Sequence, residues 1–182
     1  MTAVDALFSY DTQFGQIEAV GIPLRYVTLP PNVPKVGGFY LAARHETLQN
    51  NRKWAVGVGR AVAKGEVFIR ANPRAAAYAF LQMFPEAAPR AASLEQQIKA
   101  IMIPIEKRSP FFSSYDKTIT KWGEMSLAEF KEEIDFLGLT DKIADVPALF
   151  TNELIDEINA FDAEKIRTQA REFKIPDAPS GG

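Results

Sequence analysis

The first forty residues most constrain what this chain can fold into. Residues 4–10 form a short apolar run with a polar tip, which is typical of a strand buried on both faces. A short helix is expected over 12–19, ended by Gly21, and a second strand over 24–29. A lone parallel strand is unstable. Either the partners of the first strand are missing or another chain supplies them.

The rest of the sequence changes from strand to helix. Three prolines break the segment 30–38, and a third strand is expected over 39–43. Beyond residue 45, apolar spacing and capping residues predict successive helices. They are expected over 51–71 and 73–84, from near Leu94 and Leu127, and over 147–159 and 163–172. The expected class is α/β, with about three amino-terminal strands and a mostly helical remainder.

Composition excludes several classes of protein. With 182 residues, 47% hydrophobic and 24% charged, the chain is long enough for one globular domain or slightly more. Its formal net charge is -2 and its basic residues are scattered singly, so we expect no nucleic-acid partner. No run approaches the roughly 20 apolar residues of a membrane helix, so we expect no membrane insertion. The sequence has no cysteine, and its first residues do not form a signal peptide.

Several short motifs occur in an order that is more informative than any of them alone. They are Val4-Asp5-Ala6, Gly21-Ile22-Pro23, Gly38-Phe39-Tyr40-Leu41-Ala42, Ala61-Val62-Ala63-Lys64-Gly65, Ala71-Asn72-Pro73 and Leu149-Phe150-Thr151-Asn152-Glu153. In this order the chain resembles the carboxyl-terminal portion of an ABC-transporter solute-binding protein, of the sulfonate, nitrate and thiamine-pyrimidine branch. The resemblance covers roughly residues 4–173.

The resemblance implies a truncated, two-lobed type II periplasmic-binding-protein fold. Residues 1–44 would form the end of lobe two and the return crossing, residues 45–174 would pack on lobe one, and residues 175–182 would be a disordered tail. The full-length parent would be periplasmic and would deliver a small organic ligand, anionic, aromatic or pyrimidine-like, to an ABC permease. Without a signal peptide, this chain would be cytoplasmic if Met1 is the native start.

The expected ligand site has two parts. Ligands of open α/β sheets lie beyond the carboxyl ends of the strands, which points to Ser9, Tyr10 and Asp11. In the resembling family, this tip and the crossing segment around Gly38, Phe39 and Tyr40 face the cleft. The alternative is that both tyrosines pack in the core with a satisfied hydroxyl group.

Other polar residues have a simpler interpretation. Asp5 is expected to act as a structural cap whose carboxylate accepts hydrogen bonds, Arg25 and Arg44 to form surface ion pairs, and His45 to lie in a solvated loop. With one histidine and no cysteine, the sequence shows no recognisable metal site and no catalytic nucleophile paired with a general base. We therefore expect no catalytic residues, no cofactor and no enzyme activity.

Two alternative functions remain open. The chain could be a truncated, non-transport interaction module that forms a homodimer through its exposed strand edge. It could also resemble the pyrimidine synthases of thiamine biosynthesis, which share the fold of the solute-binding family. That enzyme depends on a cysteine-rich segment and an active-site histidine, and this sequence has no cysteine.

Overall fold

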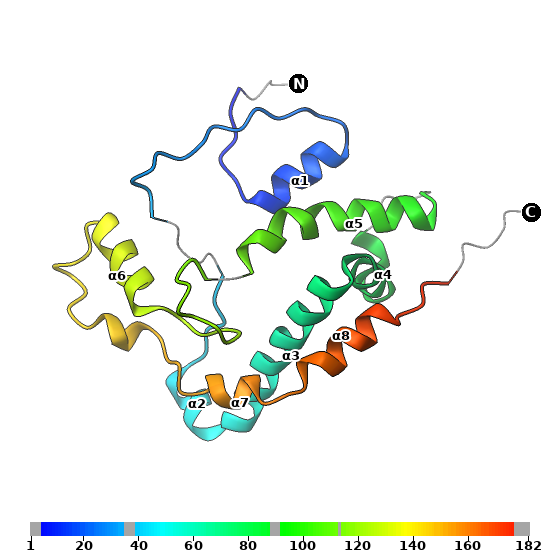
Figure 1. The fold of residues 1–182 in the computed structure, drawn as a ribbon. Helices are drawn as coiled ribbons and strands as arrows, with labels where there is room; N and C mark the ends of the chain where they lie inside the picture. Colours follow the sequence, from blue (N-terminus) through cyan, green and yellow to red (C-terminus); the bar gives the residue numbers. More distant parts are fainter. Residues whose placement is uncertain (1–4, 35–38, 88–91, 113, 177–182) are drawn as a thin grey trace, which may run out of the picture. The chain divides into compact units, whose positions relative to one another are not determined.

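In the computed structural model, which describes residues 5–34, 39–87, 92–112 and 114–176, all regular structure is helical (Figure 1). The elements in chain order are α1 (Asp11–Ala19), α2 (His45–Asn50), α3 (Arg52–Ala71), α4 (Pro73–Met83), η1 (Pro85–Ala87), α5 (Leu94–Arg108), η2 (Ser109–Phe111), α6 (Leu127–Phe136), η3 (Val146–Leu149), α7 (Ile155–Asn159) and α8 (Ala163–Arg171). Helices labelled η are short 3₁₀ turns.

The predicted α/β fold with three amino-terminal strands is wrong for this part of the chain. The described residues of 5–10, 22–30 and 39–43 are neither helix nor strand. A strand exists only when a neighbour accepts and donates its backbone hydrogen bonds, and aromatic or β-branched content cannot supply that neighbour. With no strand in the described ranges, the expected truncated type II fold and the strand edge for a homodimer have no counterpart there.

The chain divides into two compact units. The first comprises Met1–Tyr26, Phe68–Pro110 and Lys165–Gly182, and the second comprises Val27–Val67 and Phe111–Glu164. Each unit is therefore assembled from stretches that lie far apart in the sequence.

The first unit has its core between α4 and α5. Ala77 and Leu81 of α4 and Ile98 of α5 are buried together. Partly buried apolar residues pack around them, namely Tyr78, Leu94, Ile101, Met102, Ile105 and Ile175. Ile175, expected to begin a disordered tail, thus packs near this core, whereas residues 177–182 lie outside the described residues.

Helix α1 lies along α5 in the same unit (Figure 1). Gly15 permits this close approach, because a Cβ atom at that position would lie 3.0 Å from Lys107 Cγ and 3.1 Å from Ile103 Cγ2. Helix α1 ends at Ala19, and Gly21, which the sequence predicted would end it, has a φ of 83°, in the left-handed conformation that favours glycine.

The junction of α3 and α4 confirms the helices predicted over 51–71 and 73–84. Asn72 is the N-cap of α4, and its Oδ1 accepts a hydrogen bond of 3.0 Å from the Ala75 amide. Pro73 follows at the first helical position, where no backbone donor is needed. The Nδ2 of Asn72 also donates to the Ala170 carbonyl in α8 over 2.8 Å. One side chain therefore satisfies backbone groups at the ends of two helices.

Two helices begin where capping residues in the sequence predicted, at Leu94 and Leu127, but only the first has a complete capping box. Ser93 Oγ accepts from the Gln96 amide over 3.3 Å, and the Ser93 amide donates to Gln96 Oε1 over 2.8 Å. Ser126 caps α6 by accepting from the Glu129 amide over 3.4 Å. The carboxylate of Glu129 instead accepts hydrogen bonds from the Ser114 hydroxyl and the Asp116 amide, so the capping box of α6 is incomplete.

In the second unit, α3 packs closely on α7. Gly59 is buried, and a Cβ atom there would lie 2.6 Å from Ile158 Cδ1. Arg52 donates to Glu157 Oε1 from Nε over 2.9 Å, and Arg60 Nη2 donates to the Glu157 carbonyl over 2.5 Å. The close packing and both arginines fix α7 against α3.

The single helix predicted over 147–159 is wrong, because the structure divides it into η3 and α7. Phe150 between them is extended, with φ −146° and ψ 170°, and its ring stacks on Phe130 at 4.6 Å between centroids. Asn152 makes two hydrogen bonds to the backbone of Met125. These long-range contacts stabilise a non-helical conformation that local helix propensity opposes.

Candidate functional site

The predicted tip residues 9–11 form the start of α1. The carbonyl of Tyr10, the N-cap, accepts from the amides of Gln13 and Phe14 over 3.0 and 3.2 Å. The Ser9 hydroxyl donates to Gln13 Oε1. Tyr10 is 61% exposed, so its ring lies at the surface. The tip is therefore a helix start and not the end of a strand.

Asp11 holds α1 against α5. Its Oδ1 accepts a hydrogen bond of 3.1 Å from Arg108 Nη1, and both side chains are mostly buried. Its Oδ2 is also buried, and no hydrogen-bond partner is found for it among the described residues. Because its charge is paired with Arg108, Asp11 is better placed to position the helix start than to contact a ligand.

A second contact between α1 and the rest of its unit involves Glu18, Tyr26 and Lys107. Glu18 accepts from Lys107 Nζ over 2.6 Å and from the Tyr26 hydroxyl over 2.9 Å. The hydrogen bond from Lys107, followed by that from Tyr26, lowers the pKa of Glu18. The hydrogen bond to Glu18 in turn raises the pKa of Lys107. The ammonium also lies 5.1 Å from the centroid of the Tyr26 ring.

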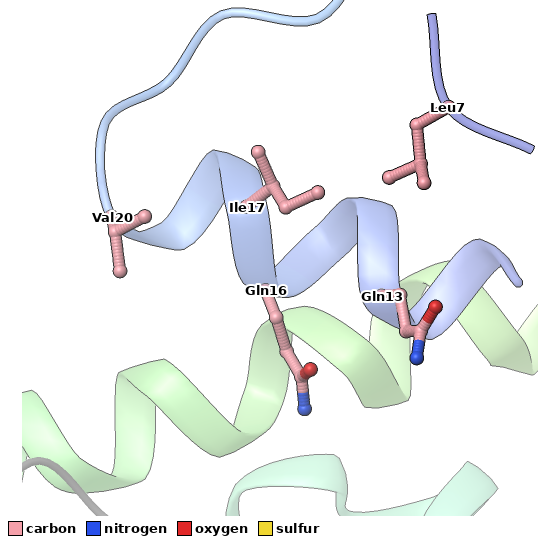
Figure 2. Close-up of a pocket in the computed structure, with 5 residues that line it drawn as sticks. All are labelled: Leu7, Gln13, Gln16, Ile17 and Val20. Atoms are coloured by element: carbon pink, nitrogen blue, oxygen red, sulfur yellow. The ribbon is translucent and has the colours of Figure 1, made fainter. Parts of the chain in front are cut away.

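A shallow hollow of about 300 Å³ lies beside α1 (Figure 2). Its lining residues are Leu7, Gln13, Gln16, Ile17 and Val20. In Figure 2, the side chains of Leu7 and Ile17 lie on one side of the helix, and the amide groups of Gln13 and Gln16 point to the other. Such a lining offers apolar contact and neutral hydrogen bonds but no titratable group for proton transfer.

The predicted crossing residues lie in the second unit. Phe39 is 66% exposed, and Gly38 lies outside the described residues. The ring of Tyr40 packs on Phe130 with 5.4 Å between centroids. Partial burial raises the pKa of Tyr40, and the carboxylates of Glu133 and Glu129 raise it further. The ring of Tyr40 is therefore packed on Phe130, and its phenol keeps its proton to a higher pH than an ordinary tyrosine does.

Five of the six predicted ligand residues lie in the described part of the chain, and they are divided between the two units. Ser9, Tyr10 and Asp11 are contiguous in the first unit, whereas Phe39 and Tyr40 belong to the second. Of the other polar residues named from the sequence, Asp5, Arg25 and Arg44 are exposed. His45, predicted to lie in a loop, is instead the first residue of α2, and its Nε2 is 2.8 Å from Gln49 Nε2.

The second unit contains a polar network that the sequence analysis missed. Asp116 Oδ2 accepts from the Ser126 hydroxyl over 2.6 Å, and its Oδ1 accepts from the amide and hydroxyl of Thr118 over 2.9 and 2.7 Å. The hydrogen bond from Ser126, followed by those from Thr118, lowers the pKa of Asp116. Glu129 Oε1 accepts from the Ser114 hydroxyl over 2.7 Å and from the Asp116 amide over 2.6 Å.

This network borders an open hollow of about 390 Å³. The hollow is lined by Pro31, Val33, Pro34, Tyr115, Asp116, Ala128, Glu129 and Glu132. The Ser-x-x-Glu pattern at 126–129 marked a helix start in the sequence. Ser126 and Glu129 of this pattern also hydrogen-bond to Asp116. That contact depends on the fold of residues 114–118, so no local sequence pattern predicted it.

Two asparagines bind the backbone of residues 122–125. Asn152 exchanges hydrogen bonds of 3.0 and 2.9 Å with the amide and carbonyl of Met125. Asn159 does the same with Trp122, both over 3.0 Å, and its Nδ2 also donates to the Ile155 carbonyl over 2.8 Å. The ring of Trp122 lies against Phe161, 5.4 Å between centroids. The side-chain amides of the two asparagines thus satisfy backbone groups of residues 122–125, which lie outside any helix and lack helical hydrogen-bond partners.

Within the described ranges, no cluster of three or more histidine or acidic side chains is arranged to hold a metal ion. None of the helices described there has the length and apolar character needed to cross a membrane. The geometry offers small hollows, hydroxyl groups and aromatic rings, which suit non-covalent binding.

Comparisons of this chain with protein-family models, curated proteins and solved structures found no match.

Proposed function

We propose that this chain is the carboxyl-terminal part of the solute-binding component of an ABC importer, which captures a small organic ligand. One observation carries the proposal. Segments 5–10, 22–30 and 39–43, which lie within the stretch that resembles the solute-binding family, expose large apolar side chains, including Phe8 (98%), Val27 (89%) and Leu41 (64%). These segments have the apolar composition of a protein core, but their side chains are exposed to solvent in the described part of the chain.

Exposure of this kind is costly for a protein that acts alone. Burying one large apolar side chain contributes about 1.5–3 kcal/mol. Soluble monomers seldom expose large continuous apolar patches. Polypeptide that covers residues 22–30 and 39–43 would supply both apolar contacts and partners for their backbone groups. In the proposal, that polypeptide is the remainder of the binding protein.

Two tyrosines, each taken within its own unit, are the proposed ligand contacts. Tyr10 in the first unit and Tyr40 in the second each present a ring for an aromatic solute and a phenol group for an anionic one, and the Tyr40 ring also contacts Phe130. The negative charge of Asp11 is paired with Arg108, which reduces its repulsion of an anion near Tyr10. Asp11 therefore enters the proposal as the residue that positions the start of α1.

Isothermal titration tests the proposal. The protein encoded by the whole open reading frame that holds this sequence is titrated with a sulfonate, nitrate, an aminopyrimidine and an aromatic carboxylate. We expect heat of binding with at least one solute. Absence of heat with all of them would count against a solute-binding function.

Conservative variants then test the site. Loss of one hydrogen-bonding hydroxyl costs about 0.5–1.5 kcal/mol, so Tyr10→Phe and Tyr40→Phe should weaken binding about 2- to 12-fold. Tyr78→Phe is the matched control, because Tyr78 packs on Phe173 beside the core of the first unit. An affinity of Tyr10→Phe equal to that of the control would exclude Tyr10 as a ligand contact, and the same comparison decides separately for Tyr40.

Hydrogen exchange tests the covering of the exposed segments. Amides of 24–29 should exchange rapidly in the isolated chain and slowly in the longer protein. Slow exchange in the isolated chain would mean that these residues are already covered.

The same exposed segments favour a second candidate, an interaction module that associates with itself. Apolar surface left uncovered by the chain can be buried by a second copy. Size exclusion with light scattering distinguishes the candidates. We expect a dimer for the isolated 20.2 kDa chain if self-association covers these segments, and a monomer would argue against the module.

A further inference from the structure

No further inference is drawn: the strongest candidate, the acid-lined hollow between residues 31–34 and helix α6 in the second unit, rests on carboxylates of which Asp116 and Glu129 already accept hydrogen bonds from the chain's own hydroxyl and amide groups, and nothing in the structure shows what would fill it.

Discussion

Three glycines in α3 allow one substitution to be tested in opposite surroundings. Gly57 and Gly65 are exposed, and a Cβ atom at either would meet nothing within 4 Å. Gly59 is buried, and its Cβ atom would lie 2.6 Å from Ile158 Cδ1 and 2.9 Å from Cγ1. The backbone conformation is helical at all three positions, so glycine-to-alanine substitution brings the same intrinsic gain.

The expected effects differ in sign. Alanine is favoured over glycine within a helix by about 0.5–1 kcal/mol, so Gly57→Ala and Gly65→Ala should stabilise the protein by about that amount. At Gly59 the same gain is opposed by overpacking, which costs about 1–3 kcal/mol. Because Ile158 can shift part of its side chain, we expect a net loss of about 1 kcal/mol for Gly59→Ala.

Urea unfolding followed by tryptophan fluorescence measures these differences. The two tryptophans, Trp54 and Trp122, both belong to the second unit, which also contains all three glycines. Ile158→Val removes the Cδ1 atom and should recover part of the loss caused by Gly59→Ala, which a double-mutant cycle measures directly. If Gly59→Ala raised the urea midpoint as much as Gly57→Ala, the close packing of α3 on Ile158 would be refuted.

Two further predictions concern polar groups of the second unit. Asn159→Asp keeps the acceptor for the Trp122 amide but sets a carboxylate oxygen against two carbonyls, so it should lower the free energy of unfolding by about 1–3 kcal/mol, measured in urea. Asn152→Asp loses one donated hydrogen bond and should cost less. Equal losses would contradict the donation by Asn159 to two carbonyls. The pKa of Asp116 is lower in the folded than in the unfolded protein, so the unfolded state binds more protons. The contribution of Asp116 to the free energy of unfolding is therefore lost as the pH falls from the pKa of the unfolded state, about 3.9, through that of the folded state. The urea midpoint should therefore fall less steeply for Asp116→Asn than for the parent protein between about pH 5 and pH 3, and parallel curves would disprove the assignment.

Local signals in the sequence predicted much of the helical structure. Asn72-Pro73 and the Ser93 box determine helix starts through groups within three residues of each other, so their outcome does not depend on distant parts of the chain. The amino-terminal strands could not be decided in this way, because a ladder depends on a neighbouring strand that no local pattern supplies. The same limit explains the interrupted helix at 150–154, where Phe130 and Met125 are the deciding partners.

The candidate site shows a similar division. A short helix was expected after the tip residues, and α1 begins at the last of them, Asp11, whereas the strand expected before it is absent from the described residues. The pairing of Asp11 with Arg108 joins positions 97 apart and has no sequence signal. Asp116 was not considered at all, since its hydrogen bonds come from Thr118 and Ser126 only once the segment before α6 has folded back. Whether Tyr10 and Tyr40 contact a ligand stays a prediction.

The discontinuous first unit has a consequence for the order of folding during synthesis. Residues 5–26 are synthesised before residues 68–110 and the residues beyond 165 that complete the same unit. The hydrogen bond from Asn72 to Ala170 spans 98 positions and can form only after residue 170 has been synthesised. Contacts of such long range slow folding, because the intervening chain must be ordered first. Residues 5–26 therefore lack part of their unit until the residues beyond 165 have been made, and a chain that is incompletely folded in this way exposes apolar surface that favours aggregation.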